Sequence, residues 1–154
     1  MRRHWIILAI VIALGLGFAF YPGFIDKPQP GADALNVKLV AQGAVLYEKH
    51  CATCHGKDLE GQDNWRERKG DSKLPAPPHD ASGHTWHHPD RVLFRVTKEG
   101  MSWVGGPAYQ SNMPAFGNVL SDAEINAVIA YIKSRWPEPL RAQQQIIDQE
   151  DRRK

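Results

Sequence analysis

The pattern of apolar and polar positions separates the start of the chain from everything that follows. An unbroken apolar run extends from Trp5 to Phe20, after Arg2 and Arg3, and no charged residue occurs from His4 to Ile25. As a helix, these 22 positions would extend about 33 Å, which is enough to cross the hydrocarbon core of a bilayer. The two arginines would stay in the cytoplasm and direct the rest of the chain outward.

The same segment has a second interpretation as a cleaved signal peptide. Such peptides usually have a shorter apolar core and end at an Ala-x-Ala-like site, for which the stretch ending at Ala19 is a poor match. Trp5 and Tyr21 lie where aromatic residues of a membrane interface would lie. We therefore favour a single transmembrane anchor at residues 1–25, with a cleaved, exported protein as the alternative.

Helical periodicity appears three times beyond this segment. Residues 26–35 are rich in Pro and Gly and predict a linker. Apolar residues recur at helical spacing in three later segments. These are 36–50 (with Val37, Val40, Ala44 and Tyr47), 89–99 (with Val92, Leu93 and Val96) and 121–136 (with Ile125, Val128, Ile129, Ile132 and Trp136).

The boundaries of these helices carry their own signals. Ser121 and Glu124 have the spacing of a capping box, and Pro137 ends the last periodic segment. Pro89 suits a first helical position and Gly100 suits a helix end. The pattern predicts an all-α domain at 36–137.

Two irregular segments and a tail complete the chain. Residues 56–86 and 101–120 show no periodicity, and loops of such length in a small domain are typically functional or disordered. The side chains of these loops could pack against a bound cofactor. The polar, charged residues 138–154 predict a frayed helix or disorder, with no function assigned.

Composition and charge restrict the class of function. With 154 residues, one domain plus appendages is expected. Outside the first 25 residues, 17 Lys and Arg face 17 Asp and Glu, so the domain is a poor candidate for binding nucleic acid.

The two cysteines of the chain lie in one pentapeptide, CATCH, at residues 51–55. Cys-x-x-Cys-His is the spacing for covalent attachment of one haem, with His55 below the iron as proximal ligand. A redox dithiol would follow a strand and has no need of His55. A structural zinc site needs four ligands, and no second cysteine pair exists. A disulfide or two idle thiols is the simplest alternative, and haem is favoured over all three.

The order of these features resembles the class I cytochrome c family over about residues 36–137. CATCH follows a helix, and NMPAF at 112–116 precedes the last helix. The stretch GHTWHHPD at 83–90 is similar to a subgroup of bacterial monohaem cytochromes that are often membrane-attached. The resemblance implies three to four helices around one covalently bound haem c, preceded here by a transmembrane helix.

The resemblance also implies roles for individual residues. Cys51 and Cys54 would form the thioethers, with His55 and Met113 as the axial ligands of the iron. A proline carbonyl would accept the other N–H of His55, and the candidates are Pro75 and Pro77. Gly43 and Tyr47 would cross the last helix at Tyr131.

Several residues of the exported domain have competing interpretations. A methionine is often a core filler, and Met101 is the competing thioether. His79, His84, His87 and His88 would permit bis-histidine ligation or a copper site at His87 and His88. The simplest alternative has His88 capping the helix at Pro89 and His87 packing at the haem edge. Trp86 and Trp103 are expected as pocket walls.

The leading hypothesis is an electron carrier with no small-molecule substrate and no catalytic residue, serving redox partner proteins. It would be anchored to the bacterial cytoplasmic membrane, with the haem domain on the periplasmic side. A haem enzyme or ligand sensor with a labile distal position is the second hypothesis. An exported copper-binding module is the third.

Overall fold

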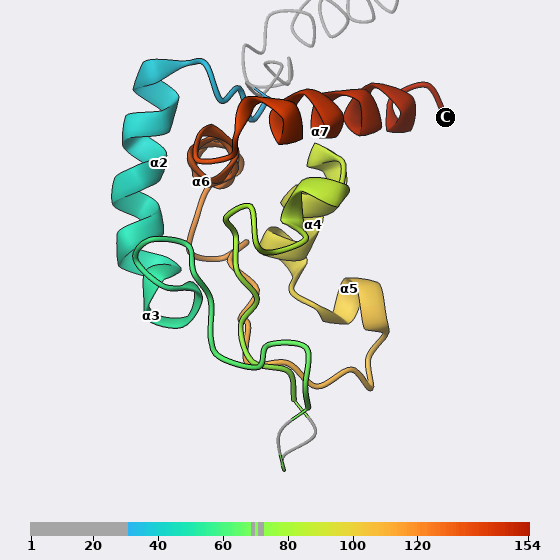
Figure 1. The fold of residues 1–154 in the computed structure, drawn as a ribbon. Coiled ribbons are helices and arrows are strands. Elements are labelled where there is room, and N and C mark those ends of the chain that lie inside the picture. Colours follow the sequence, from blue (N-terminus) through green and yellow to red (C-terminus); the bar gives the residue numbers. More distant parts are fainter. Residues whose placement is uncertain (1–30, 69, 71–72) are drawn as a thin grey trace, which may run out of the picture.

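Helices and connecting loops make up the described part of the chain (Figure 1). The computed structural model describes residues 31–68, 70 and 73–154, and no strand forms among them. The elements are α2 (Val37–His50), α3 (Ala52–His55), η1 (Thr85–His87), α4 (Asp90–Glu99), α5 (Ser102–Gly105), α6 (Asp122–Ser134) and α7 (Glu138–Asp151). The predicted all-α class is therefore confirmed.

The predicted anchor at residues 1–25 lies outside the described residues, as does the first half of the linker. Within the part of the chain that is described, no helix has the length and apolar character needed to cross a membrane.

Two of the three predicted helices begin at a side-chain cap, of which the one at Ser121 was predicted from the sequence. The Asn36 side chain accepts a hydrogen bond from the Leu39 amide at the start of α2. At α6, Ser121 and Glu124 form both hydrogen bonds of a capping box. Each cap satisfies amides that have no partner within the helix itself. The local sequence is therefore sufficient to place these two starts.

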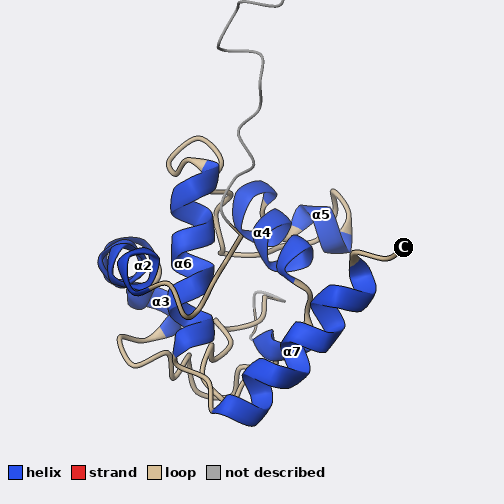
Figure 2. Ribbon diagram, turned by 90° about the horizontal axis from the view of Figure 1, so that it is seen from above, coloured by secondary structure: helices blue, strands red, loops and turns tan. Residues whose placement is uncertain are grey.

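Helices α2 and α6 lie side by side and form the framework of the domain (Figure 2). Gly43 is buried at their crossing, where a β-carbon would overlap the Ala127 carbonyl group and the Tyr131 side chain. One turn further along α2, the rings of Tyr47 and Tyr131 are 5.3 Å apart. The predicted crossing of Gly43 and Tyr47 with Tyr131 is confirmed.

The inner face of α6 forms the centre of the hydrophobic core. Ile125, Val128, Ile129 and Ile132 are all buried, and Trp136 just beyond the helix is 1% exposed. These are the residues that the helical periodicity placed on one face. The Trp136 indole N–H donates to the His79 carbonyl at 2.7 Å, so the core is also attached to the long loop.

The C-terminal residues form a helix rather than a disordered tail. Helix α7 runs from Glu138 to Asp151 and packs across η1 and the start of α4 (Figure 2). Its buried side chains are polar, namely Gln144 and Asp148. A helix with a polar buried face lacks the apolar stripe on which a prediction from periodicity depends.

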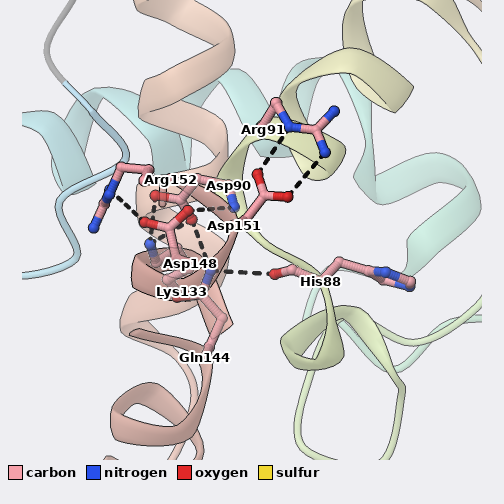
Figure 3. Close-up of polar contacts among 8 residues, drawn as sticks. All are labelled: His88, Asp90, Arg91, Lys133, Gln144, Asp148, Asp151 and Arg152. Carbon is pink, nitrogen blue, oxygen red and sulfur yellow. Dashed lines mark hydrogen bonds and ion pairs between the residues drawn. The ribbon is translucent and has the colours of Figure 1, made fainter. Parts of the chain in front are cut away.

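A network of polar contacts attaches α7 to the first residue of α4 (Figure 3). The Asp148 carboxylate accepts from the Asp90 amide at 3.0 Å. The Gln144 side chain donates to the Asp90 carboxylate at 2.8 Å and to the His88 carbonyl at 3.2 Å. Lys133 of α6 also pairs with Asp90, at 2.6 Å. Three helices therefore meet at one aspartate.

This network corrects the expected start of α4. The helix begins at Asp90, with Pro89 at the N-cap and no cap from that residue's side chain. His88 was expected to provide the cap, but Asp148 of α7 accepts from the free amide instead. A carboxylate at this position also interacts favourably with the positive end of the helix dipole. The cap of α4 comes from 58 residues away in sequence.

We expect Asp148→Ala to destabilise the domain by about 2 kcal/mol, because it leaves a partly buried amide unpaired and removes a helix cap. Thermal unfolding of the purified chain would measure the change. Glu150→Ala, on the exposed face of the same helix, is the matched control and should have little effect. Equal stability of both variants would show that α7 is not attached through Asp148.

Candidate functional site

The candidate site is a cavity of about 650 Å³ between α3, α4, α6 and the two long loops. Its volume lies in the range of small-molecule and cofactor sites. Apolar side chains of α4 and α6 form much of its wall. These are Val92, Leu93, Val96, Val128, Ile129 and Ile132.

All four residues predicted to hold the haem line this one cavity. Cys51, Cys54 and His55 come from the turn that follows α2, and Met113 comes from the loop before α6. The sequence separates Cys51 and Met113 by 62 positions, and the fold brings both to the same space.

The two cysteines lie on one helical turn. The Cys54 amide donates to the Cys51 carbonyl at 3.1 Å, and the two thiols are free rather than joined in a disulfide. Burial, with a smaller contribution from Cys54, raises the pKa of Cys51 to about 11. Reactive redox thiols instead have lowered pKa values. The environment of Cys51 therefore does not favour the thiolate that a redox dithiol uses.

His55 is held in the tautomer that suits an iron ligand. Its ring is buried, and Nδ1 lies 2.8 Å from the Pro77 carbonyl oxygen. Because a carbonyl can only accept, Nδ1 carries the proton and Nε2 keeps its lone pair. Burial lowers the pKa of His55, which keeps the imidazole neutral. Of the two candidate prolines, Pro77 makes the contact.

The Tyr47 side chain fixes the end of the CATCH turn. Its hydroxyl donates to the Gly56 carbonyl at 3.1 Å, with the His55 carbonyl 3.4 Å away. Burial is the main reason that the pKa of this phenol is raised well above its usual value. Helix α2 thus orients the turn that carries the two cysteines and His55.

Two thioethers reach the cavity. Met113 is half-buried and packs against the core, and its amide donates to the Ser111 hydroxyl at 3.1 Å. Met101, the competing candidate, lies at the start of α5 and also lines the cavity. The choice between them stays a prediction.

The four histidines between residues 79 and 88 have different environments. His84 stacks on Trp65 and is 5.4 Å from His88, and both histidines line the cavity. Burial, together with neighbouring histidines, lowers the pKa of both. His87 instead stacks on Trp86 at 3.6 Å and does not line the cavity.

Of the two histidines considered for a copper site, His88 lines the cavity and His87 does not. The described residues contain no group of three or more His, Cys, Asp and Glu side chains that could hold a metal ion. The same observation leaves the zinc interpretation of the cysteines without the further ligands it needs.

The tryptophans expected as pocket walls do not line the cavity. Trp86 packs against the core, and its buried indole N–H lacks a hydrogen-bond partner among the described residues. Trp103 lies under the Arg95 guanidinium, 4.5 Å from it. Trp65 is the tryptophan that lines the cavity, with Arg66 4.0 Å from its ring. Sequence analysis missed Trp65 because it lies in a loop without periodicity.

The position of His79 was not predicted either. Its ring stacks on His55, with centroids 4.0 Å apart and planes inclined by 21°. Burial and the neighbouring His55 hold the pKa of His79 well below its usual value. The one signal in the sequence was that His79 lies two positions after Pro77, a candidate hydrogen-bond partner of His55.

These residues fit a haem. The apolar walls suit a porphyrin, the two thiols lie on one turn, and a neutral imidazole and two thioethers face the same space. The fold and the site together define a haem protein of the c type.

The comparison with protein families identifies the class more closely. The family model described as cytochrome c matches residues 40–136, which is well over half of the chain. The chain belongs to the cytochrome c family. Its haem c is therefore covalently bound, and Cys51 and Cys54 have the spacing of the attachment motif. Proteins of this family transfer electrons and are in general carriers rather than enzymes.

A curated relative is the Cbb3-type cytochrome c oxidase subunit FixP of Azorhizobium caulinodans. The two sequences are 28% identical over 94 residues, which cover 61% of this chain and 28% of the relative. The chain thus spans less than a third of the length of that protein. No solved structure matches.

Proposed function

We propose that the protein is a single-electron carrier in which His55 and Met113 ligate the haem iron. The observation that carries this proposal is the placement of His55 in the cavity, with Nδ1 bound to Pro77 and Nε2 free, together with the Met113 thioether in the same cavity. The haem would supply the ferric and ferrous states between which electrons are exchanged. With His55 and Met113 both bound to the iron, no position on it would remain for a substrate.

The residues around the haem would set its reduction potential. The Pro77 carbonyl increases the electron donation of His55, whereas a thioether and apolar walls favour the ferrous state. The apolar side chains of Val92, Leu93 and Val96, which line the cavity on the α4 side, would keep water from the cofactor. Together, these influences should give the haem a higher reduction potential than bis-histidine ligation would give.

The partners would be other redox proteins, met through weak and short-lived contacts. The relative from Azorhizobium caulinodans is named as a subunit of a cytochrome c oxidase, which favours respiratory proteins as the class of partner. We also propose that residues 1–25 anchor the chain in the bacterial cytoplasmic membrane, with the haem domain outside. An anchor raises the effective concentration near membrane-bound partners.

The experiment that tests this proposal is an optical spectrum of the chain made in a host able to attach haem. We expect haem to stay with the chain after denaturation, and the oxidised protein to show the weak red-edge band of iron–thioether ligation. Carbon monoxide and cyanide should bind poorly to the untreated protein, because no iron position is vacant.

Other outcomes would change the proposal in defined ways. Covalent haem without the red-edge band would remove Met113 from the iron and favour a histidine that lines the cavity, such as His50, His84 or His88. Tight binding of carbon monoxide would favour an enzyme or sensor with an open iron position. Absence of covalent haem would overturn the assignment of the cysteines.

A further inference from the structure

His79 has no role in the proposed function, yet its ring lies against the proposed iron ligand. The imidazoles of His55 and His79 stack with centroids 4.0 Å apart and planes only 21° from parallel. A second imidazole in this position contacts the face of the ligand, whereas the Pro77 carbonyl contacts its edge.

Several contacts with other elements fix the position of His79. Its Nδ1 lies 2.9 Å from the hydroxyl of the buried Thr85. Its amide donates to the Leu59 carbonyl at 2.8 Å, and its carbonyl accepts from the Trp136 indole. The ring is therefore held through both its backbone and its side chain, and it is a fixed surface against which another ring can pack.

We propose that His79 is a positioning residue that, together with the Pro77 carbonyl, sets the plane of the His55 imidazole and thereby the electronic state of the ferric iron. This inference rests on the proposed ligation of the iron by His55. The contact joins the last residue of α3 to a residue of the long loop and depends on no surface or partner.

The hydrogen bond to Pro77 does not by itself fix the plane of the His55 ring. The outer torsion of a histidine is broad, so a single contact at Nδ1 permits rotation of the ring about that contact. A stacked ring opposes this rotation, because offset or parallel aromatic pairs have a preferred geometry. Groups in the second shell orient metal ligands in this way and tune the metal through them. The orientation of an axial imidazole controls the g values of low-spin ferric haem.

His79 also adds a polar group beside the ligand. Burial and the nearby His55 keep its ring uncharged, so its influence comes from shape and dipole rather than from a full charge. Because polar surroundings favour the more highly charged ferric state, an apolar side chain at this position should raise the reduction potential. Orientation and polarity can therefore be separated by the choice of substitution.

The test compares the haem-loaded full chain with three variants. His79→Leu removes both the ring and the dipole, His79→Phe keeps a ring but removes the dipole, and Thr85→Val removes the hydrogen bond that orients the ring. His87→Leu is the matched control, since His87 lies in η1, a short way further along the chain, and stacks on Trp86 instead. The measurements are the ferric electron paramagnetic resonance g values, the reduction potential and the melting temperature.

We expect His79→Leu to change the g values and raise the potential. His79→Phe should retain g values near those of the original protein while the potential rises, and Thr85→Val should broaden the g values. The control should leave both unchanged. A purely structural role would lower the melting temperature of the variants without moving the g values. If His79→Leu fails to load haem, the g values of Thr85→Val decide the question.

The failure of this inference is distinguishable from the failure of the proposed function. Labelling the histidines with nitrogen-15 and measuring the nitrogen coupling to ferric iron in the original protein shows whether a histidine is bound, and its absence would overturn both. If the coupling is present and the g values of His79→Leu and Thr85→Val match the original, only the role of His79 is overturned.

Discussion

Replacement of Met113 by alanine should leave haem attached to Cys51 and Cys54 and lower the reduction potential strongly. Attachment depends on the two thiols at the α3 turn, and Met113 lies in a different segment, the loop before α6. On the proposed ligation, loss of the thioether removes a ligand that favours ferrous iron, and water or a histidine would take its place. A fall on the order of 0.1 V or more is expected, since axial ligands set haem potentials over a range of roughly 0.8 V.

Spectroelectrochemical titration of the purified protein would measure this fall, and the red-edge band of the oxidised spectrum should vanish with it. Met101→Ala is the matched control, because Met101 also lines the cavity but lies at the start of α5. We expect it to keep the band and to shift the potential little. The reverse result, with the band lost in Met101→Ala and kept in Met113→Ala, would assign the iron to the other thioether.

The second large effect is expected at the crossing of α2 and α6. Gly43→Val would place side-chain atoms where the Ala127 carbonyl and the Tyr131 side chain already lie. Neither neighbour can move easily, since one is helix backbone and the other packs on Tyr47. Insertion of atoms into a closely packed contact typically costs 1–3 kcal/mol, and here we expect roughly 3 kcal/mol or more.

This substitution should also disturb the site, because the same helix carries the cysteine turn at its end. Chemical denaturation monitored by circular dichroism would give the loss of stability, and the yield of haem-loaded protein would report on the site. Ala41→Val is the matched control on the exposed face of α2 and should cost only a few tenths of a kcal/mol. If both variants are equally stable, the helices do not approach as closely as described.

The fold was largely predictable because its main helices are marked locally. Asn36 and Ser121 cap α2 and α6, and the buried residues of α6 recur at helical spacing. For α7 the sequence left a frayed helix or disorder open, since its buried Gln144 and Asp148 are polar and bond to the Asp90 side chain and amide at the start of α4. Its packed face is recognisable only when the partner helix is known.

In the candidate site, too, the features marked by local sequence were predicted and those that depend on distant contacts were not. CATCH and the Met-Pro pair at residues 113–114 indicated the cofactor and its expected ligands, because attachment chemistry depends on spacing within a few residues. The pocket walls were predicted incorrectly at Trp86 and Trp103, which do not line the cavity. A tryptophan's chemistry is the same in a core and in a pocket wall, so only its surroundings distinguish the two.

The sequence by itself determined the all-α class, two helix starts, the cysteine turn and the binding of haem c, since each depends on interactions between residues close in the chain. The tertiary structure decided that Pro77 holds His55, that His79 stacks on the same ring, and that α7 caps α4. Each of these contacts joins segments separated by a loop whose path has no periodic signal. Such contacts depend on how the whole chain packs, and local patterns do not record them.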